Sequence, residues 1–63
     1  MNIGENIKRL RLQAGLTQTQ LADTVGISTA MVCQIERGSR TPTMPLGKQI
    51  AEALGKTIDD LID

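Results

Sequence analysis

Apolar residues recur every three or four positions along the chain, in five runs separated by glycines and short polar turns. This spacing places each run on one side of a helix. The predicted helices cover residues 3–14, 17–25, 28–37, 43–54 and 57–63. No stretch alternates with a period of two, so no strand is predicted and the fold class is all-α. The positions expected to face inward are Ile3, Ile7, Leu10 and Ala14; Leu21, Ala22 and Val25; Val32 and Ile35; Leu46, Ile50, Ala51 and Leu54; and Ile58, Leu61 and Ile62.

The residues that flank these runs are typical helix caps. Thr17 and Gln20 have the T-x-x-Q spacing of a capping box, in which each side chain satisfies a backbone N–H of the other residue. Glycines at positions 15, 26, 38 and 55 end the first four helices, because glycine adopts the left-handed conformation of a helix end without a steric penalty. The other expected N-terminal caps are Ser28, Thr43 and Thr57.

The connection between the second and third helices is very short. Only Gly26, Ile27 and Ser28 separate them. Two helices joined so closely must cross steeply, as they do in a helix-turn-helix. Ala22 is expected near the crossing, where a larger side chain would push the helices apart. The sequence therefore predicts a helix-turn-helix over these two helices.

The third helix has an outward side suited to DNA. Val32 and Ile35 define its inward direction, and at about 100° per residue the opposite side carries small, polar or basic residues and no carboxylate, with Glu36 at its border. Such a side can enter the major groove without repelling phosphates, and the amide of Gln34 could read adenine there. An ordinary solvated surface is the alternative interpretation. The candidate base contacts are Thr29, Ala30, Cys33 and Gln34.

Phosphate contacts are predicted at the helix ends that flank this side. Gln18 lies in the first turn of the second helix, where free N–H groups favour an anion. For Gln18 the alternative is a residue that is merely exposed. Basic and hydroxyl side chains at the two ends of the third helix could grip the backbone on its other side. The candidate phosphate contacts are Gln18, Ser28, Arg37, Ser39 and Arg40.

The composition narrows the possible functions. A length of 63 residues allows one small domain, taken as residues 1–63, without spare volume for an internal cofactor pocket. The absence of Phe, Trp and Tyr removes the rings on which single-stranded nucleic acids stack. With no His, no metal-ligand spacing and no Ser–base pair, nothing in the chain indicates catalysis. We expect no enzyme activity, no metal, no cofactor and no small-molecule ligand.

Charge is unevenly distributed, although the formal net charge is zero. Residues 1–43 hold five Lys or Arg against three Asp or Glu, whereas residues 44–63 hold two against four. A basic DNA-facing part is one interpretation of this polarity, and two solvated surfaces of unlike sign are the other. No apolar run is long enough to span a membrane, and no signal-peptide core follows Met1. The expected location is cytoplasmic, without a membrane partner.

The stretch "LTQTQLADTVGISTAMVCQIERG", followed by the pattern P-T…L…IA-ALG…L, resembles the DNA-binding domain of the phage repressor and Cro family, the Xre-type regulators. The resemblance extends from Ile3 to Leu61. It implies a lambda-repressor-like fold of five short helices, with the helix-turn-helix at the second and third. The residues that fit the family pattern are Gln18, Leu21, Ala22, Val25, Gly26, Ser28, Val32, Ile35, Glu36 and Gly38.

The resemblance also implies roles for single residues. Gln18 would hold a phosphate, and Arg11 would pair with Glu36 to tie the first helix to the end of the third. The sequence departs from the family at Ala30 and Cys33, where many relatives carry longer polar side chains. Direct base readout is therefore sparse, and DNA shape carries more of the specificity. The residues implied to face bases are Thr29, Ala30 and Gln34.

The resulting hypothesis is a transcriptional regulator, repressor or activator, that binds double-stranded DNA of specific sequence. One recognition helix contacts too few base pairs to select a genomic site, so a homodimer on a palindromic operator is expected, with the third helix in the major groove. The final helix is too short to bury all its apolar residues, and Met44 or Leu54 could join them. The candidate dimer contacts are Ile58, Leu61 and Ile62, and the alternative is that the same three residues close the core of the monomer.

Two alternatives remain open at this point. The chain could be an antitoxin-type or other protein-interaction module whose DNA binding is autoregulatory, although an antitoxin usually needs more chain than ends at Asp63. Cys33 could be a redox switch rather than a plain small residue, with Arg37 as the nearby cation that would lower a thiol pKa.

Overall fold

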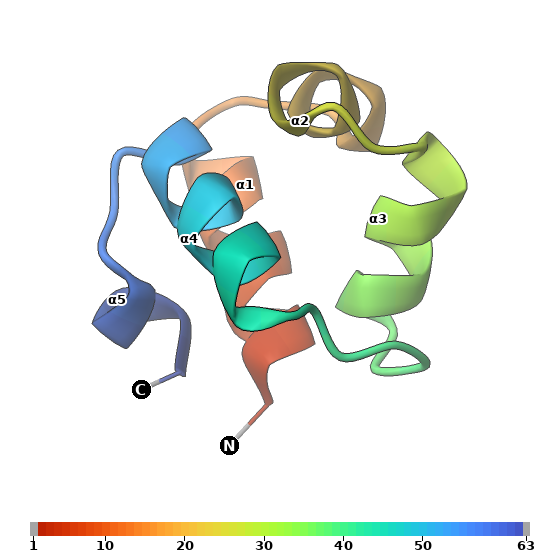
Figure 1. The fold of residues 1–63 in the computed structure, drawn as a ribbon. Coiled ribbons are helices and arrows are strands. Elements are labelled where there is room, and N and C mark those ends of the chain that lie inside the picture. Colours follow the sequence, from red (N-terminus) through yellow and green to blue (C-terminus); the bar gives the residue numbers. More distant parts are fainter. Residues whose placement is uncertain (1, 63) are drawn as a thin grey trace.

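Five helices follow one another in the predicted order, and the all-α prediction is confirmed (Figure 1). The computed structural model describes residues 2–62, and no strand occurs within them. Each helix begins and ends within one residue of its predicted bounds. Met1 and Asp63, the two ends of the predicted domain, lie outside the described residues. The helices are α1 (Ile3–Gln13), α2 (Gln18–Val25), α3 (Thr29–Glu36), α4 (Met44–Ala53) and α5 (Ile58–Ile62).

Side-chain caps explain where α2 and α3 begin. The Thr17 hydroxyl accepts a hydrogen bond from the backbone N–H of Gln20 at 3.0 Å, and the amide oxygen of Gln20 accepts one from the N–H of Thr17 at 2.9 Å. This is the predicted capping box, which satisfies two N–H groups that the helix leaves without partners. At the start of α3 the Ser28 hydroxyl accepts from the N–H of Met31 at 3.0 Å.

The two C-terminal helices begin differently from the prediction. Thr43 precedes α4 but makes no side-chain capping bond, and Pro45 in the first turn has no N–H to donate to it. At α5 the N–H and the hydroxyl of Thr57 both donate to Oδ2 of Asp60, at 2.9 and 3.0 Å. These bonds, the backbone one most, favour the carboxylate and lower the pKa of Asp60. Their stabilising effect is present above the ordinary carboxyl pKa and is lost as the pH falls through the lowered one.

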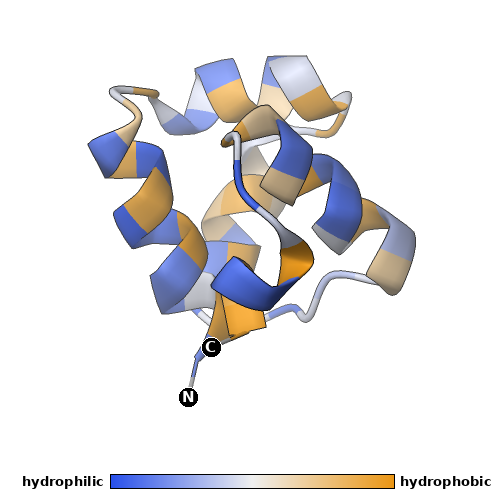
Figure 2. Cartoon of the chain, turned by 90° about the vertical axis from the view of Figure 1, so that its left-hand side faces the viewer, coloured by the Kyte–Doolittle hydropathy of each residue, from blue (hydrophilic) through white to orange (hydrophobic). Residues whose placement is uncertain are grey.

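All five helices contribute to one core, whose buried side chains are entirely aliphatic. Figure 2 shows hydrophobic and hydrophilic residues alternating along the helices, which gives the helices an apolar and a polar side. Two predicted inward positions, Ala14 and Ile62, are exposed instead. Ala14 is exposed because α1 ends at Gln13 and the chain turns at Gly15. The core consists of Ile7, Leu10, Leu21, Ala22, Val32, Ile35, Ile50, Ala51, Leu54 and Leu61, with Ile3, Val25, Leu46 and Ile58 packed partly buried against it.

The short helix α5 closes the core against α1 and α4. Leu61 is 0% exposed, and its carbonyl accepts a hydrogen bond from Nδ2 of Asn6 at 2.7 Å. The prediction that Leu61 contacts a second copy is therefore wrong, because the core of its own chain covers this side chain completely. Ile58 is partly buried by the same core. Of the three candidate dimer contacts only Ile62, at 44%, is well exposed.

The N-terminal turn of α1 lies directly against the C-terminal turn of α3. A Cβ atom added at Gly4 would overlap the carbonyl oxygen of Ile35 and would lie 3.0 Å from that of Glu36. Both oxygens belong to the backbone, so neither can rotate out of the way. Gly4 thus determines how closely α1 approaches α3. Nothing in the hydrophobic pattern indicates this role, since the glycine only interrupts a helical run.

We predict that Gly4→Ala destabilises the protein by about 1–3 kcal/mol, the usual cost of overpacking, although alanine is intrinsically the better helix former by about 1 kcal/mol. Gly47→Ala is the matched control, because a Cβ there would meet only the flexible Cδ1 of Ile58, at 3.0 Å. Thermal unfolding of both variants measures the difference. A Gly4→Ala protein at least as stable as the unaltered one would contradict the prediction.

Candidate nucleic-acid interface

The backbone itself makes the turn between α2 and α3. The N–H groups of Gly26 and Ile27 both donate to the carbonyl of Ala22, at 2.8 and 3.0 Å. Gly26 adopts a φ of +85°, a conformation that residues with a side chain rarely adopt. Ala22 is buried at 1% exposure, as expected for a small residue near a helix crossing. The predicted helix-turn-helix is present, and Ser28 caps its second helix.

The helix α3 buries one side and presents the other. Val32 and Ile35 are buried in the core, as predicted. Ala30 and Arg37 are exposed. The remaining candidates on this side, Thr29, Cys33 and Gln34, are half-buried. No carboxylate lies among these five positions, so this side of α3 does not repel phosphates.

The loop after α3 folds back over the last turn of the helix. The N–H of Ser39 donates to the carbonyl of Gln34 at 2.9 Å, and the N–H of Gly38 donates to that of Ile35 at 3.1 Å. These two bonds form a Schellman motif at the C-terminus of α3. The motif requires a residue in the left-handed conformation, which Gly38 supplies with a φ of +82°. Three candidate phosphate contacts lie at or directly after the end of α3, and all three are exposed: Arg37, Ser39 and Arg40.

The other two candidate phosphate contacts lie at the starts of α2 and α3. Ser28 is exposed, and its hydroxyl oxygen already accepts the capping bond of α3. Gln18 is half-buried, and its Nε2 donates to Oε1 of Glu36 at 3.1 Å. The interpretation of Gln18 as a merely exposed polar residue is therefore wrong. This bond connects the start of α2 to the end of α3.

A buried ion pair lies behind this surface. Nε of Arg11 is 2.7 Å from Oε2 of Glu36, and the two side chains are only 7% and 2% exposed. Nη2 of Arg11 also donates to Oε1 of Glu36, at 3.1 Å, and Nη1 donates to the carbonyl of Leu16 at 2.7 Å. The structure thus brings together the two residues that the family resemblance pairs. It differs from the helical wheel, which placed Glu36 at the border of α3 rather than inside.

The sequence pattern does not indicate one contact at this surface. The hydroxyl of Thr29 donates to that of Thr19, on α2, at 3.3 Å. No helical periodicity relates residues ten positions apart, so the pair arises only from the way the helices cross. Thr19 is exposed and lies beside the candidate phosphate contact Gln18 in the first turn of α2.

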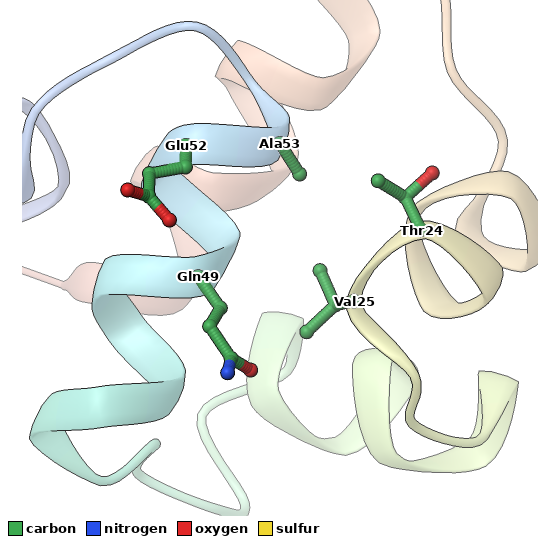
Figure 3. A pocket seen from close by; sticks show the side chains of 5 residues that line it. All are labelled: Thr24, Val25, Gln49, Glu52 and Ala53. Carbon is green, nitrogen blue, oxygen red and sulfur yellow. The ribbon is translucent and has the colours of Figure 1, made fainter.

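The groove between α2 and α4 is unsuited to DNA (Figure 3). Its only charged lining residue is Glu52, an acid, which would repel a phosphate. Residues 2–62 hold no cluster of three or more His, Cys, Asp or Glu that could bind a metal ion. No helix in that range has the length and apolar character needed to cross a membrane. The other residues that line the groove are Thr24, Val25, Gln49 and Ala53.

Comparison with known proteins agrees with this geometry. Residues 7–61 match the helix-turn-helix family. The chain belongs to this family. It is 37% identical over 60 residues to an uncharacterized HTH-type transcriptional regulator, y4dJ, of Sinorhizobium fredii, a match that covers 95% of this chain and 78% of the relative.

Two solved structures show the same arrangement of helices. The solution structure of the DNA-binding domain of the P22 c2 repressor superposes with a TM-score of 0.95 at 27% identity, over 98% of this chain and 82% of that one. SinR, a master regulator for biofilm formation solved in complex with DNA, superposes with a TM-score of 0.90 at 27% identity, over 97% and 98% of the two chains. The resemblance to phage repressors is confirmed, and the chain is a DNA-binding transcriptional regulator of a non-enzymatic class.

We predict that the Arg11–Glu36 pair stabilises the helix-turn-helix protein cooperatively. Arg11→Met and Glu36→Leu should each cost about 3–5 kcal/mol, because each leaves an uncompensated buried charge. The double variant should lose much less than the sum of the two. Thermal or denaturant unfolding measures all three. A folded double variant beside unfolded single variants would also support the coupling, whereas strictly additive losses would refute it.

Proposed function

We propose that this helix-turn-helix protein binds double-stranded DNA of specific sequence as a homodimer on a palindromic operator, with α3 in the major groove, and thereby represses or activates transcription. In this proposal residues 1–63 act as one DNA-binding domain. The observation that carries the proposal is the outward side of α3, free of carboxylates and bordered at both ends by possible phosphate contacts.

The proposed contacts divide into two kinds, because phosphate contacts position a protein while base contacts specify the sequence. Gln34 is the longest polar side chain on the outward side of α3 and would read a base edge through its amide. Ala30 and Cys33 are short, so DNA shape would contribute to specificity. The proposed base contacts are Thr29, Ala30, Cys33 and Gln34, and the proposed phosphate contacts are Gln18, Ser28, Arg37, Ser39 and Arg40.

The distribution of cations supports this division. Arg11 is neutralised by Glu36 inside the protein and is not available to a phosphate. Among the proposed phosphate contacts, Arg37 and Arg40 are the two cations, and both are exposed. Two cations per copy make four in a dimer, so the logarithm of the binding constant should fall with the logarithm of the salt concentration with a slope of about −4.

The proposed dimer interface is smaller than the sequence predicted. Leu61 and Leu54 are buried in the core and cannot contribute. Ile62 is 44% exposed and Met44 68% exposed, while Ile58 offers only part of its surface. So few apolar side chains favour a weak free dimer that DNA assembles. The half-sites would lie about 34 Å apart, one turn of the double helix.

We predict that a duplex selected from a random-sequence library by this protein is released by salt with that slope. Arg40→Ala should make the slope shallower by about one unit per copy, since one phosphate contact is lost. Gln34→Ala should instead leave the slope unchanged and cost about 1–3 kcal/mol at one base position of the selected site. Fluorescence anisotropy over a salt series measures both effects.

The controls for this experiment are Lys56→Ala, which also removes one positive charge, and Gln49→Ala, which makes the same change as Gln34→Ala; both positions are exposed and lie outside the proposed DNA contacts. Neither should alter the slope or the specificity. Binding that is independent of salt would overturn the proposed function. Equal losses of specific and non-specific binding in Gln34→Ala would reassign Gln34 to a phosphate.

We predict that two copies bind one palindromic duplex at saturation. Ile62→Lys should weaken the cooperativity of binding with little effect on unfolding, because the side chain is already 44% exposed. Leu12→Lys is the control, since Leu12 is a 58% exposed aliphatic residue on α1. Analytical ultracentrifugation with and without the duplex measures the stoichiometry. A single copy per duplex at saturation would rule out the dimer.

A further inference from the structure

One carboxylate holds side chains from two other helices at the rear of the proposed DNA surface. Oε2 of Glu36 accepts from Nε of Arg11 at 2.7 Å, and Oε1 accepts from Nη2 of Arg11 and from Nε2 of Gln18, both at 3.1 Å. An ionised carboxylate can only accept hydrogen bonds. Glu36 therefore requires the amide of Gln18 to present its nitrogen rather than its oxygen.

This bond uses only part of the donor capacity at the start of α2. A primary amide nitrogen carries two hydrogens, so one hydrogen of the Gln18 side chain remains available. The backbone N–H groups of Gln18 and Thr19 lie in the first turn, where the helix itself provides no acceptor. The N–H groups of Thr17 and Gln20 are not available to a ligand, because both already donate within the capping box. Three donors are thus left close together at one helix end.

The recognition helix offers no other residue to hold this amide. Among residues 2–62, Glu36 is the only hydrogen-bond partner of the Gln18 side chain. Thr29, at the start of α3, directs its hydroxyl to Thr19 instead. Glu36 itself is anchored by Arg11 with its side chain 2% exposed, so it cannot turn outward to meet DNA.

We propose that Glu36 is a positioning residue for DNA binding: it holds the amide of Gln18 so that the remaining side-chain N–H joins the backbone N–H groups of Gln18 and Thr19 on one DNA phosphate. Glu36 does not touch DNA. Its effect is to restrict the Gln18 rotamers on folding, so that this entropy is not lost again on binding. This inference rests on the proposed function. It gives Glu36 a role in DNA binding in addition to its ion pair with Arg11 inside the fold.

The test is a double-mutant cycle on affinity for the duplex selected by the unaltered protein. Gln18→Ala should weaken binding about tenfold, the usual effect of losing one charge-assisted hydrogen bond. Glu36→Gln should cause a similar loss when Gln18 is present, because a neutral amide can face Gln18 with either its oxygen or its nitrogen. In the Gln18→Ala background, Glu36→Gln should cause little further loss.

Each affinity is measured at a temperature where circular dichroism shows the variant folded. Glu36→Asp replaces Glu36→Gln if the latter does not fold, since it keeps a negative charge to compensate Arg11 while its shorter side chain moves the carboxylate out of its present bond to Gln18. Thr24→Ala, on the opposite end of α2 beside the α2–α4 groove, is the control and should leave affinity unchanged. Equal losses from the Glu36 variant in both backgrounds would overturn the inference and leave the proposed function intact.

A second measurement needs no variant. In the free, unaltered protein, nitrogen-15 relaxation should give the Nε2 group of Gln18 an order parameter near that of rigid backbone, about 0.85, and well above that of the exposed Gln49 on α4. A mobile Gln18 amide in the free protein would overturn the inference. Failure to select any duplex would overturn the proposed function, and this inference with it.

Discussion

The way in which α1, α2 and α3 meet depends on the buried carboxylate of Glu36 and its partners. This carboxylate is almost completely removed from water, which is tolerable only because the guanidinium of Arg11 approaches to 2.7 Å and a second donor comes from Gln18. Arg11 comes from α1, Gln18 from α2 and Glu36 from α3, so satisfying one anion determines how three helices meet. Among residues 2–62, no buried side-chain nitrogen or oxygen is left without a hydrogen-bond partner.

The apolar core acts together with this polar junction. It is built from aliphatic side chains alone, which bury surface without dictating a unique orientation. Orientation comes instead from contacts that admit one arrangement: the buried ion pair, the backbone approach at Gly4, and the turn at Gly26. The result is that α3 is held along its inner side and at its C-terminal end, while Ala30 and Arg37 on its outer side remain exposed.

The division between inner and outer sides explains why such a small domain can both fold and bind DNA. Val32 and Ile35 face the core, and Glu36 completes the polar junction. Ala30 and Arg37 contribute nothing to either and remain exposed. Substitution at these two exposed positions should therefore leave unchanged how the helix is held.

Local sequence determined most of the secondary structure. Helical periodicity, the capping box at Thr17 and Gln20, and glycine at helix ends each act within a few residues, and each predicted helix agrees with the structure to within one residue. The same reasoning predicted the helix-turn-helix and the side of α3 that faces away from the core. It could do so because burial of an apolar stripe requires only that some core exists, not a particular partner.

Only the tertiary structure decided which residues share a contact across helices. These contacts connect positions that no regular spacing relates. They are the full burial of Leu61, the close approach of Gly4 to α3, the bond between Thr19 and Thr29, and the bond from Gln18 to Glu36. A helical wheel ranks a residue by its angle on its own helix, so it placed Glu36 at a border. Whether such a residue is buried depends on what the neighbouring helix offers it, here a guanidinium, and that is a property of the assembled fold.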